Sequence, residues 1–331
     1  MLKLPYLQIR SNLIISYNLP VEKYIRSTAL NDRLTQILRE TPTYSGLLCP
    51  GAKKRLTRSI ELFSMAVNSE PEQRIINPST GKAMSFKFNF ITLTIYSTDR
   101  NITGKEAHKQ CLEPFLQWMR RVQKVKLYIW KAELQKRGQI HYHITTNKYI
   151  DKDDIRNKWN QLQRDAGYLD TFYKKYGRWN APSTHVKKVR HVRDMASYLT
   201  KEIAKTMQNG TSIGGKVWDC SMNLKTSQYY TTDDCTGEYA GRINQMVRDK
   251  QLKVVYTDNC CIFKTIQEPA FKILNNRDLL EYQQHLSNVV VKEQELIRKR
   301  AKKHEIIEHF ASNIALQRFK IVPVPDLFSS S

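Results

Sequence analysis

The stretch Lys131-Ala-Glu-Leu-Gln-Lys-Arg-Gly-Gln-Ile-His-Tyr-His-Ile-Thr145 decides both the fold and the chemistry that this chain predicts. Residues 139–145 alternate as a strand does, so that three apolar side chains share one face while His141 and His143 share the other. Residues 127–133 also have the composition of a strand, being rich in Leu, Tyr, Ile and Trp. The two segments therefore predict an antiparallel hairpin.

The turn of this hairpin sets its register. Lys136, Arg137 and Gly138 suit a three-residue loop in which the glycine adopts the left-handed conformation. That loop places Glu133 opposite His141, and residues so opposed have Cβ atoms about 4.5–5.5 Å apart. His143 lies one pleat further along on the same face.

One carboxylate and two imidazoles on one side of a sheet predict a divalent-metal site. Because the set leaves coordination positions free, it favours Mn²⁺ or Mg²⁺ acting on a phosphate over a closed structural zinc site. The same pattern is also compatible with two half-exposed strand histidines beside a solvated glutamate, since a His-x-His pair alone is a weak motif.

Composition sets the broad class of the protein. The chain has 331 residues, of which 40% are hydrophobic, and this predicts two or three domains with a substantial core. No apolar run approaches the length of a membrane helix, and Pro5 interrupts the N-terminal apolar stretch, so neither a membrane span nor a secretion signal is expected. The six cysteines are scattered without a CxxC pair, which favours a reduced, intracellular protein in the cytoplasm of a host cell, a bacterial one in our interpretation.

Charge indicates the partner. The net charge is +23, and residues 81–225 carry 28 basic against 12 acidic residues, which accounts for +16 of it. The excess therefore surrounds the predicted metal site and does not lie in a tail. A polyanion, most often nucleic acid, is the expected partner of such a surface.

The chain divides into three regions by pattern. Residues 1–80 are predicted to be helical, with helices over 21–39 and 52–67, residues 81–225 form the central domain, and residues 226–331 form a mainly helical accessory region. The central domain is predicted as α+β, with an antiparallel sheet and helices packed on it. Its expected elements are strand 86–95, helix 104–122 (Leu112, Phe115, Leu116, Met119 and Val122 on one face), the hairpin, helix 151–164, strand 184–189, helix 195–207 and strand 217–224. In the last region we expect strands over 252–256 and 262–266 and a long charged helix from Asp278 to about residue 311.

A nucleophile is predicted on the helix over residues 195–207. Tyr198, Lys201 and Lys205 share one stripe of that helix, beside an apolar stripe that would pack on the sheet. A tyrosine with an ammonium one turn away can act as a covalent nucleophile, because the ammonium stabilises phenolate character or holds phosphate oxygens. The ordinary alternative is a tyrosine at the edge of the core with solvated lysines.

Three of these segments together resemble the HUH-type rolling-circle replication initiators, or Rep endonucleases, of the single-tyrosine class. Phe90-Ile-Thr-Leu-Thr94 resembles their first strand, Glu133 with His141-Tyr142-His143 resembles their metal motif, and Tyr198-Leu-Thr-Lys201 resembles their Y-x-x-K motif. The resemblance covers about residues 85–225 and is greatest to initiators of small single-stranded DNA phages and related plasmids.

The resemblance implies a sheet-centred nuclease that nicks and rejoins single-stranded origin DNA. By the same resemblance, Glu133, His141 and His143 would ligate Mn²⁺ or Mg²⁺, and Tyr198, supported by Lys201, would form a 5′-phosphotyrosine and leave a free 3′-hydroxyl. A host polymerase would extend that hydroxyl, and a host helicase would unwind the duplex. A transposase or a relaxase with the same chemistry is the nearest alternative, and a non-catalytic single-strand nucleic-acid-binding module is the alternative from another class.

Further residues are candidates for DNA contacts. Phe172-Tyr-Lys-Lys-Tyr-Gly-Arg-Trp179 interleaves aromatic and cationic side chains, as single-strand stacking platforms do, although core packing fits its aromatics equally well. The candidates are Tyr173, Trp179, Lys187, Lys188, Arg190, Lys205 and Arg137. His185 is a candidate further ligand, with a structural role favoured. Gly210-Thr-Ser-Ile-Gly-Gly-Lys216 resembles a phosphate-binding loop, but Val217 stands where a Ser or Thr must hold Mg²⁺, so no nucleotide cofactor is predicted.

Overall fold

The computed structural model describes residues 3–20, 49–70, 73–76, 81, 83–97, 102–135, 138–189, 213–233, 237–257, 260–266 and 268–290. All of them belong to one compact unit, Met1–Val290, and Val291–Ser331 form a second unit outside the described residues. The predicted helices over 21–39 and 195–207 also lie outside the described residues.

The central domain is built on a five-stranded sheet in which all neighbours are antiparallel, as predicted. Its strand order is β8-β5-β7-β6-β9. The strands are β5 (Phe88–Thr94), β6 (Tyr128–Leu134), β7 (Ile140–Thr146), β8 (Thr184–Val189) and β9 (Trp218–Cys220). β5 has a neighbour on both sides, β7 and β8. The predicted strand over 217–224 is wrong beyond Cys220, because the chain turns there into a short helix, α8 (Met222–Thr226), that buries Leu224.

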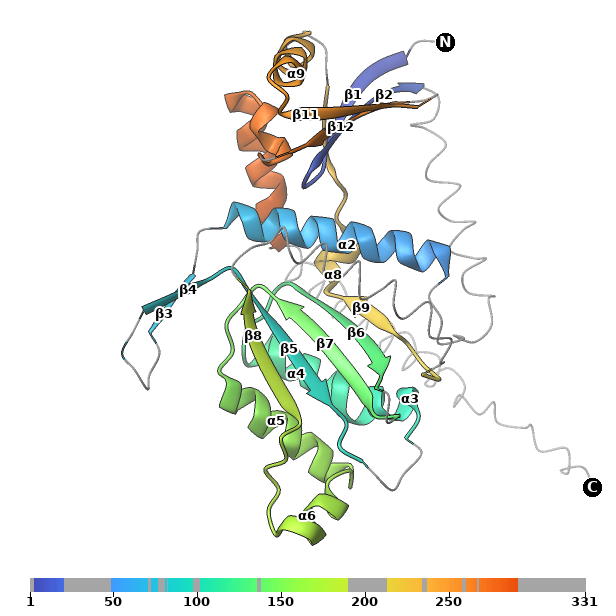
Figure 1. Cartoon of the computed structure of the whole chain (residues 1–331), viewed down its shortest axis with the longest axis vertical. Helices are drawn as coiled ribbons and strands as arrows, with labels where there is room; N and C mark the ends of the chain where they lie inside the picture. Colours follow the sequence, from blue (N-terminus) through green and yellow to red (C-terminus); the bar gives the residue numbers. More distant parts are fainter. Residues whose placement is uncertain are drawn as a thin grey trace, which may run out of the picture. The chain divides into compact units, whose positions relative to one another are not determined.

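One face of this sheet is the core of the domain (Figure 1). Helices α4 (Glu113–Arg121) and α5 (Lys152–Asp165) pack on it, and Trp159 of α5 stands edge-on to Tyr142 of β7, with ring centroids 6.1 Å apart. The Trp159 indole also donates a hydrogen bond to the Thr94 carbonyl, 2.9 Å away. The predicted α5 begins as expected, because the Asp151 side chain accepts a hydrogen bond from the Asp153 N–H and caps the helix.

The predicted helix over 104–122 is confirmed from Gly104 to Arg121, but it is not a single α-helix. It consists of α3 (Gly104–Ala107), a π-helical segment η1 (His108–Leu112) and α4. Four of the five predicted core residues are buried, but Val122 is 62% exposed. The reason is that α4 ends at Arg121, Lys124 takes a left-handed φ of 55°, and the Val125 N–H then donates to the Met119 carbonyl. Val125 is therefore buried in place of Val122.

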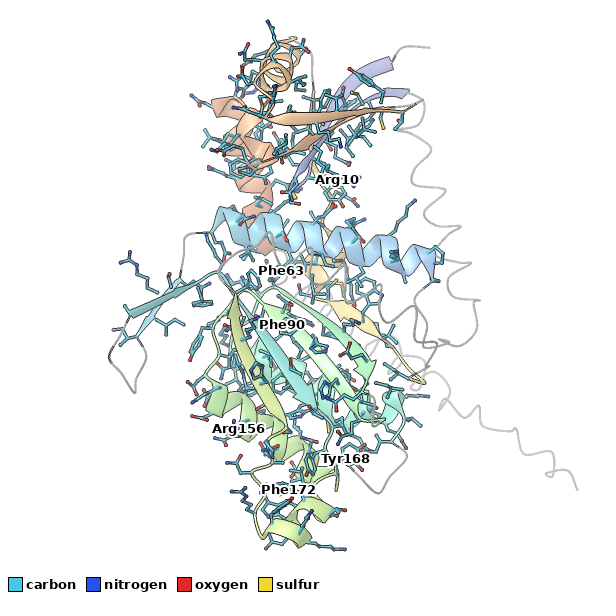
Figure 2. All side chains as sticks on the ribbon, in the orientation of Figure 1. Arg10, Phe63, Phe90, Arg156, Tyr168 and Phe172 are labelled. Carbon is cyan, nitrogen blue, oxygen red and sulfur yellow. The ribbon has the colours of Figure 1, made fainter. Side chains whose placement is uncertain are left out.

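Helix α2 (Pro50–Ser69) covers part of the opposite face of the sheet. Phe63 of α2 points toward the sheet (Figure 2) and meets Phe88 of β5 edge-on, with ring centroids 6.3 Å apart. The Ser59 hydroxyl lies 3.4 Å from the Cys220 sulfur on β9. Side chains alternate along a strand, so Phe88, Phe90, Thr92 and Thr94 share this face. α2 thus covers the end of β5 that contains Phe88, and the functional site lies at the other end, near Thr94.

The prediction that residues 1–80 are helical is confirmed by α2, which contains the predicted helix over 52–67, but it is wrong for residues 73–76, which form a strand, and for residues 3–20. Residues 3–20 form β1 (Lys3–Ile9) and β2 (Leu13–Pro20), which join β10 (Tyr230–Asp233), β11 (Leu252–Tyr256) and β12 (Cys260–Thr265) in a second antiparallel sheet of order β10-β1-β2-β12-β11. The predicted strands of residues 252–256 and 262–266 are confirmed, with β12 beginning two residues earlier. Regions that lie more than 200 residues apart in the sequence therefore share one sheet.

The remaining elements are short, apart from one helix of the C-terminal region. They are β3 (Gln73–Ile76), β4 (Ala83–Phe86), α6 (Asp170–Tyr176), α9 (Glu238–Arg248) and η2 (Ala270–Ile273). Residues 276–290 are helical, in agreement with the start of the predicted long helix. Among the described residues, no helix combines the length and the apolar character that crossing a membrane requires.

Met119 and Val122 give a direct test of how the helix over 104–122 packs. Met119 is fully buried, so Met119→Ala should lower the free energy of unfolding by about 2–5 kcal/mol through lost burial and a residual cavity. Val122→Ala should change it by less than about 0.5 kcal/mol, because the side chain is already in solvent. Urea denaturation of both variants measures the difference, and similar losses in both would contradict this packing.

Candidate metal centre

The β6–β7 hairpin has the predicted register. Glu133 pairs with His141, and the Gln135 N–H donates to the Gln139 carbonyl at 2.8 Å to close the loop. Gly138 has a φ of +79°, the left-handed value that the loop was predicted to need. The turn therefore fixes which side chains of the two strands meet.

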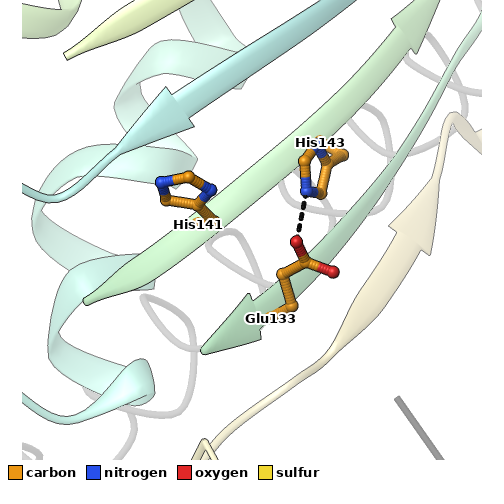
Figure 3. A group of neighbouring side chains, drawn as sticks. All are labelled: Glu133, His141 and His143. Atoms are coloured by element: carbon orange, nitrogen blue, oxygen red, sulfur yellow. Dashed lines mark hydrogen bonds and ion pairs between the residues drawn. The ribbon is translucent and has the colours of Figure 1, made fainter. Parts of the chain in front are cut away.

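Glu133, His141 and His143, called here the metal triad, converge on the face of the sheet opposite the helices α4 and α5 (Figure 3). One ligand atom of each residue lies within 4.8 Å of the others, and all three side chains are half-buried. Among the described residues, no other group of three or more metal-ligating side chains brings its ligand atoms this close together. The His143 Nε2 lies 2.7 Å from the Glu133 Oε1.

Strand β5 supplies a second layer of contacts to the two imidazoles. Thr92 pairs with His143 and Thr94 pairs with His141, and the hydroxyl of each threonine lies by a ring nitrogen of its partner, at 3.3 and 2.8 Å. Phe90 stacks on the His143 ring, with centroids 5.3 Å apart and planes 22° apart. Such contacts orient the imidazoles before any ligand arrives, which is the usual task of the groups around metal ligands. Sequence reasoning placed residues 90–94 in a strand but did not assign this role to the threonines.

Lys131 is a further residue beside the triad, and sequence reasoning did not single it out. It lies on the triad face opposite His143, it is only 3% exposed, and its Nζ is 3.4 Å from the Glu133 Oε2. The sequence did contain a signal for this position, because the hairpin register that places Glu133 opposite His141 also places Lys131 opposite His143. The His143 hydrogen bond and the charges of His143 and Lys131 together outweigh partial burial and lower the pKa of Glu133 to about 2. Glu133 is therefore a carboxylate at any physiological pH.

His141 is held in its neutral form. Burial, and secondarily the charge of His143, lower the pKa of His141 to about 4, against a smaller opposing effect of Glu133. The neutral imidazole is the form that binds a metal. Glu133 and His141 thus need no proton loss at neutral pH before they can act as ligands.

The donor set fits a divalent cation. Two imidazole nitrogens and one carboxylate oxygen suit Mn²⁺ and, less well, Mg²⁺, and three ligands leave positions for substrate oxygens or water. The His143–Glu133 hydrogen bond occupies the two ligand atoms in the structure, so a cation would replace that bond by bonds of its own. The triad is therefore a candidate metal centre with an open coordination sphere.

The candidate nucleophile cannot be placed against this triad. Tyr198, Lys201 and Lys205 all lie outside the described residues, as do Arg137 and Arg190 and the side chain of Lys188. These assignments stay predictions.

Three of the candidate DNA contacts are described. Lys187 pairs with Phe90 across β8 and β5, so its exposed side chain is on the triad face. Tyr173 and Trp179 stack with ring centroids 4.2 Å apart and planes 11° apart, and Tyr173 is 43% exposed. Core packing therefore applies to Phe172, which is buried in a small core, whereas the Tyr173 ring remains at the surface.

His185 and the glycine-rich stretch also have defined places. His185 is exposed on β8 opposite Thr92, on the triad face, but it is not one of the three residues whose ligand atoms converge. The described end of the glycine-rich stretch packs on the start of α3, where the Gly104 N–H donates to the Ile213 carbonyl at 2.9 Å.

Comparison with known proteins gives one match. Residues 88–207 match the model of a family of replication-associated proteins, that of the ORF2 type. The match spans 120 of the 331 residues and includes β5 to β8 and the metal triad. It is consistent with a replication initiator. No curated protein and no solved structure matches the chain.

The lowered pKa of His141 predicts a specific loss of stability in acid. The unfolded chain, with a histidine pKa of about 6.5, binds more protons than the folded protein between that pH and about 4. The free energy of unfolding therefore falls as the pH falls through this window, and His141→Asn should lose less stability there than the wild-type protein. Urea denaturation across the window, with each protein referred to its own value near neutral pH, measures the effect. Parallel pH profiles for the two proteins would show that His141 is not shielded as described.

Proposed function

We propose that this protein initiates rolling-circle replication by nicking and rejoining single-stranded origin DNA, as a metal-dependent HUH-type endonuclease and strand transferase of the single-tyrosine class. The observation that carries the proposal is the metal triad, which the β6–β7 register assembles at the end of the sheet that α2 does not cover. The match of residues 88–207 to a replication-associated family supports the replication role. The net charge of +23 supports a nucleic-acid substrate.

Glu133, His141 and His143 would hold Mn²⁺ or Mg²⁺ in this proposal. When bound, the cation would polarise the scissile phosphodiester and help to neutralise the charge that develops on it. Thr92 and Thr94 keep the two imidazoles oriented, and His143, with a smaller contribution from Lys131, favours the ionised form of Glu133. These side chains stand ready before DNA binds, so little reorganisation accompanies substrate binding.

Tyr198 would supply the covalent step. The phenol gives up its proton as its oxygen attacks the phosphorus, the bond from phosphorus to the 3′ oxygen breaks, and that oxygen takes up a proton to become a free 3′-hydroxyl, so that no proton is gained or lost overall. The 5′ end remains as a phosphotyrosine, and attack by a 3′-hydroxyl on it reverses the step and joins the strands. Lys201 would stabilise the phenolate or the phosphate oxygens. A host polymerase and helicase in the cytoplasm would act on the products, with no nucleotide cofactor bound by this chain.

Single-stranded DNA would approach across the triad face. Lys187 stands exposed on that face, and Tyr173 presents an exposed ring at the surface beyond β5. Arg137, Lys188, Arg190, Lys205 and Trp179 are the further contacts in this proposal.

Covalent attachment is the first test of the nucleophile. Wild-type protein incubated with 5′-labelled or 3′-labelled origin single strand and Mn²⁺ should become attached to the fragment whose 5′ end lies at the nick, so that the 3′ label stays with the protein and the 5′ label is released. Tyr198→Phe should abolish attachment, because it removes the attacking oxygen while it keeps the ring. Tyr256→Phe, at a tyrosine that is 82% exposed on β11, is the matched control and should attach normally. An intact strand with wild-type protein under all conditions would indicate a non-catalytic binding module, and normal attachment by Tyr198→Phe would assign the nucleophile elsewhere.

The metal ligands are tested by separating cleavage from binding. His141→Ala and His143→Ala should each lower the cleavage rate by at least about 100-fold, since metal polarisation is worth several kcal/mol. Both should keep much of the salt-sensitive DNA affinity, because that affinity comes from lysine and arginine contacts with phosphates. His185→Ala removes an exposed histidine from the same face and should still cut. Normal cutting by both triad variants would refute the metal assignment, whereas loss of cutting in His185→Ala alone would move a ligand to β8.

A further inference from the structure

The second sheet has one face in the core and a second face that the core does not use. Leu7, Ile9 and Ile14 are completely buried on the inner face, against a cluster that includes Ile243 of α9 and Leu286 of the helix over 276–290. Side chains alternate along each strand, so the residues between them form an outer face. An antiparallel sheet of this kind often has one solvated face.

The outer face is defined by the cross-strand pairs of β1, β2, β12 and β11. Tyr6 pairs with Tyr17, Gln8 with Ile15, Ile15 with Ile262, Ile262 with Val255, and Lys264 with both Leu13 and Lys253. These side chains are half-buried or exposed, and none of them is among the residues that form or pack against the hydrophobic core. Their surface therefore combines aromatic rings, aliphatic side chains and cations.

Two features of the outer face favour an anionic, ring-bearing ligand. Tyr6 and Tyr17 lie side by side on neighbouring strands, with ring centroids 6.3 Å apart and planes 25° apart. Lys253 and Lys264 face each other directly across β11 and β12, both exposed, and neither forms an ion pair with a described residue. Like charges in directly opposed positions destabilise a sheet, so this pair is unfavourable by itself and is relieved when an anion lies between the ammonium groups.

We infer that this outer face is a second binding surface for single-stranded DNA, in which bases stack on Tyr6 and Tyr17 and Lys253 and Lys264 contact the phosphates. Aromatic rings with neighbouring cations are the usual composition of surfaces that bind single strands without sequence preference. The choice of DNA as the strand rests on the proposed function and on the net charge of the chain. The surface does not contain the metal triad, so it would hold a strand whether or not the chain cuts it.

A protein partner fits this surface less well. Lysine is depleted in protein–protein interfaces, and burying two opposed lysines there would leave both charges without partners. Glu61, an acidic residue near the β1–β2 turn, already accepts a hydrogen bond from Tyr229 and lies 3.8 Å from Arg10, so it does not offset the lysine pair. Duplex DNA also fits less well, because its paired bases are stacked on one another and do not offer their faces to tyrosine rings.

The test measures binding of fluorescein-labelled oligo(dT) by anisotropy, with the full chain and with EDTA present so that no strand is cut. Tyr6→Ala with Tyr17→Ala should raise the Kd by about 5- to 100-fold, the range expected for lost base stacking. Tyr6→Phe with Tyr17→Phe keeps the rings and should bind like the wild-type protein. Tyr256→Ala, on the opposite side of the sheet by strand alternation, is the control for an exposed tyrosine.

The lysines are tested through the salt dependence of the same Kd. The double variant Lys253→Gln with Lys264→Gln should have a shallower plot of the logarithm of the association constant, 1/Kd, against the logarithm of the salt concentration. The slope should change by about 1.4, because each phosphate contact on a single strand contributes about 0.7. Lys272→Gln, at an exposed lysine of η2 that pairs with Glu268, should leave the slope unchanged. Because Lys253 and Lys264 are exposed, these variants keep the test decisive if the tyrosine variants fail to fold.

Unchanged Kd and unchanged slope in folded variants would overturn the inference. The inference would also be overturned if light scattering showed that the wild-type chain is a dimer and that the tyrosine variants are monomers. In that case the outer face would bind a second copy of the chain. The nicking chemistry is tested separately, by covalent attachment at Tyr198, and a negative result there does not affect the interpretation of oligo(dT) binding.

Discussion

The register of one β-hairpin is the constraint on which the functional site depends. Because side chains alternate with a period of two, a slip of one residue between β6 and β7 would turn Glu133 away from both histidines. The loop with Gly138 in the left-handed conformation and the Gln135–Gln139 hydrogen bond prevent such a slip. The apolar side chains on the other face of β7 also oppose a slip, because a slip would expose Ile140, Tyr142 and Ile144, which are buried. The core and the metal triad therefore specify the same register.

The triad also depends on a polar environment that is only partly open to water. Glu133 stays ionised because His143 and Lys131 stand beside it, and His141 stays neutral because burial and the nearby His143 disfavour an imidazolium. Lys131 and Glu133 form an ion pair in this partly buried site, where burial makes an unpaired charge costly. The same arrangement that prepares the ligands for a cation makes the folded protein sensitive to acid.

What the sequence predicts correctly here is local, and what it misses is long-range. The hairpin follows from a turn and a period of two within fifteen residues, and the burial of α4 and α5 follows from helical spacing over one element. The strands β1 and β2 pair with each other as a local hairpin, which the helical reading of residues 1–80 overlooked. Their outer neighbours β10 and β12 lie in residues 230–265, and no local pattern reports that pairing. The roles of Thr92 and Thr94 likewise need the β5–β7 register, which no turn connects. Val122 was misassigned because the helix ends one residue before it, and a spacing rule does not reveal where the chain turns.

The two sheets show how one structural rule produces two different surfaces. In each, alternation commits one face to the core, and the other face can then carry residues that do not stabilise the fold. The first sheet carries a carboxylate, two imidazoles and a buried lysine there, and the second carries two tyrosines and two directly opposed lysines. Such residues are not what packing alone would select, since Val or Thr at these positions would favour a sheet more. Local departures from stable sheet chemistry are expected where a protein binds something, and in the described part of this chain they occur on the second face of both sheets.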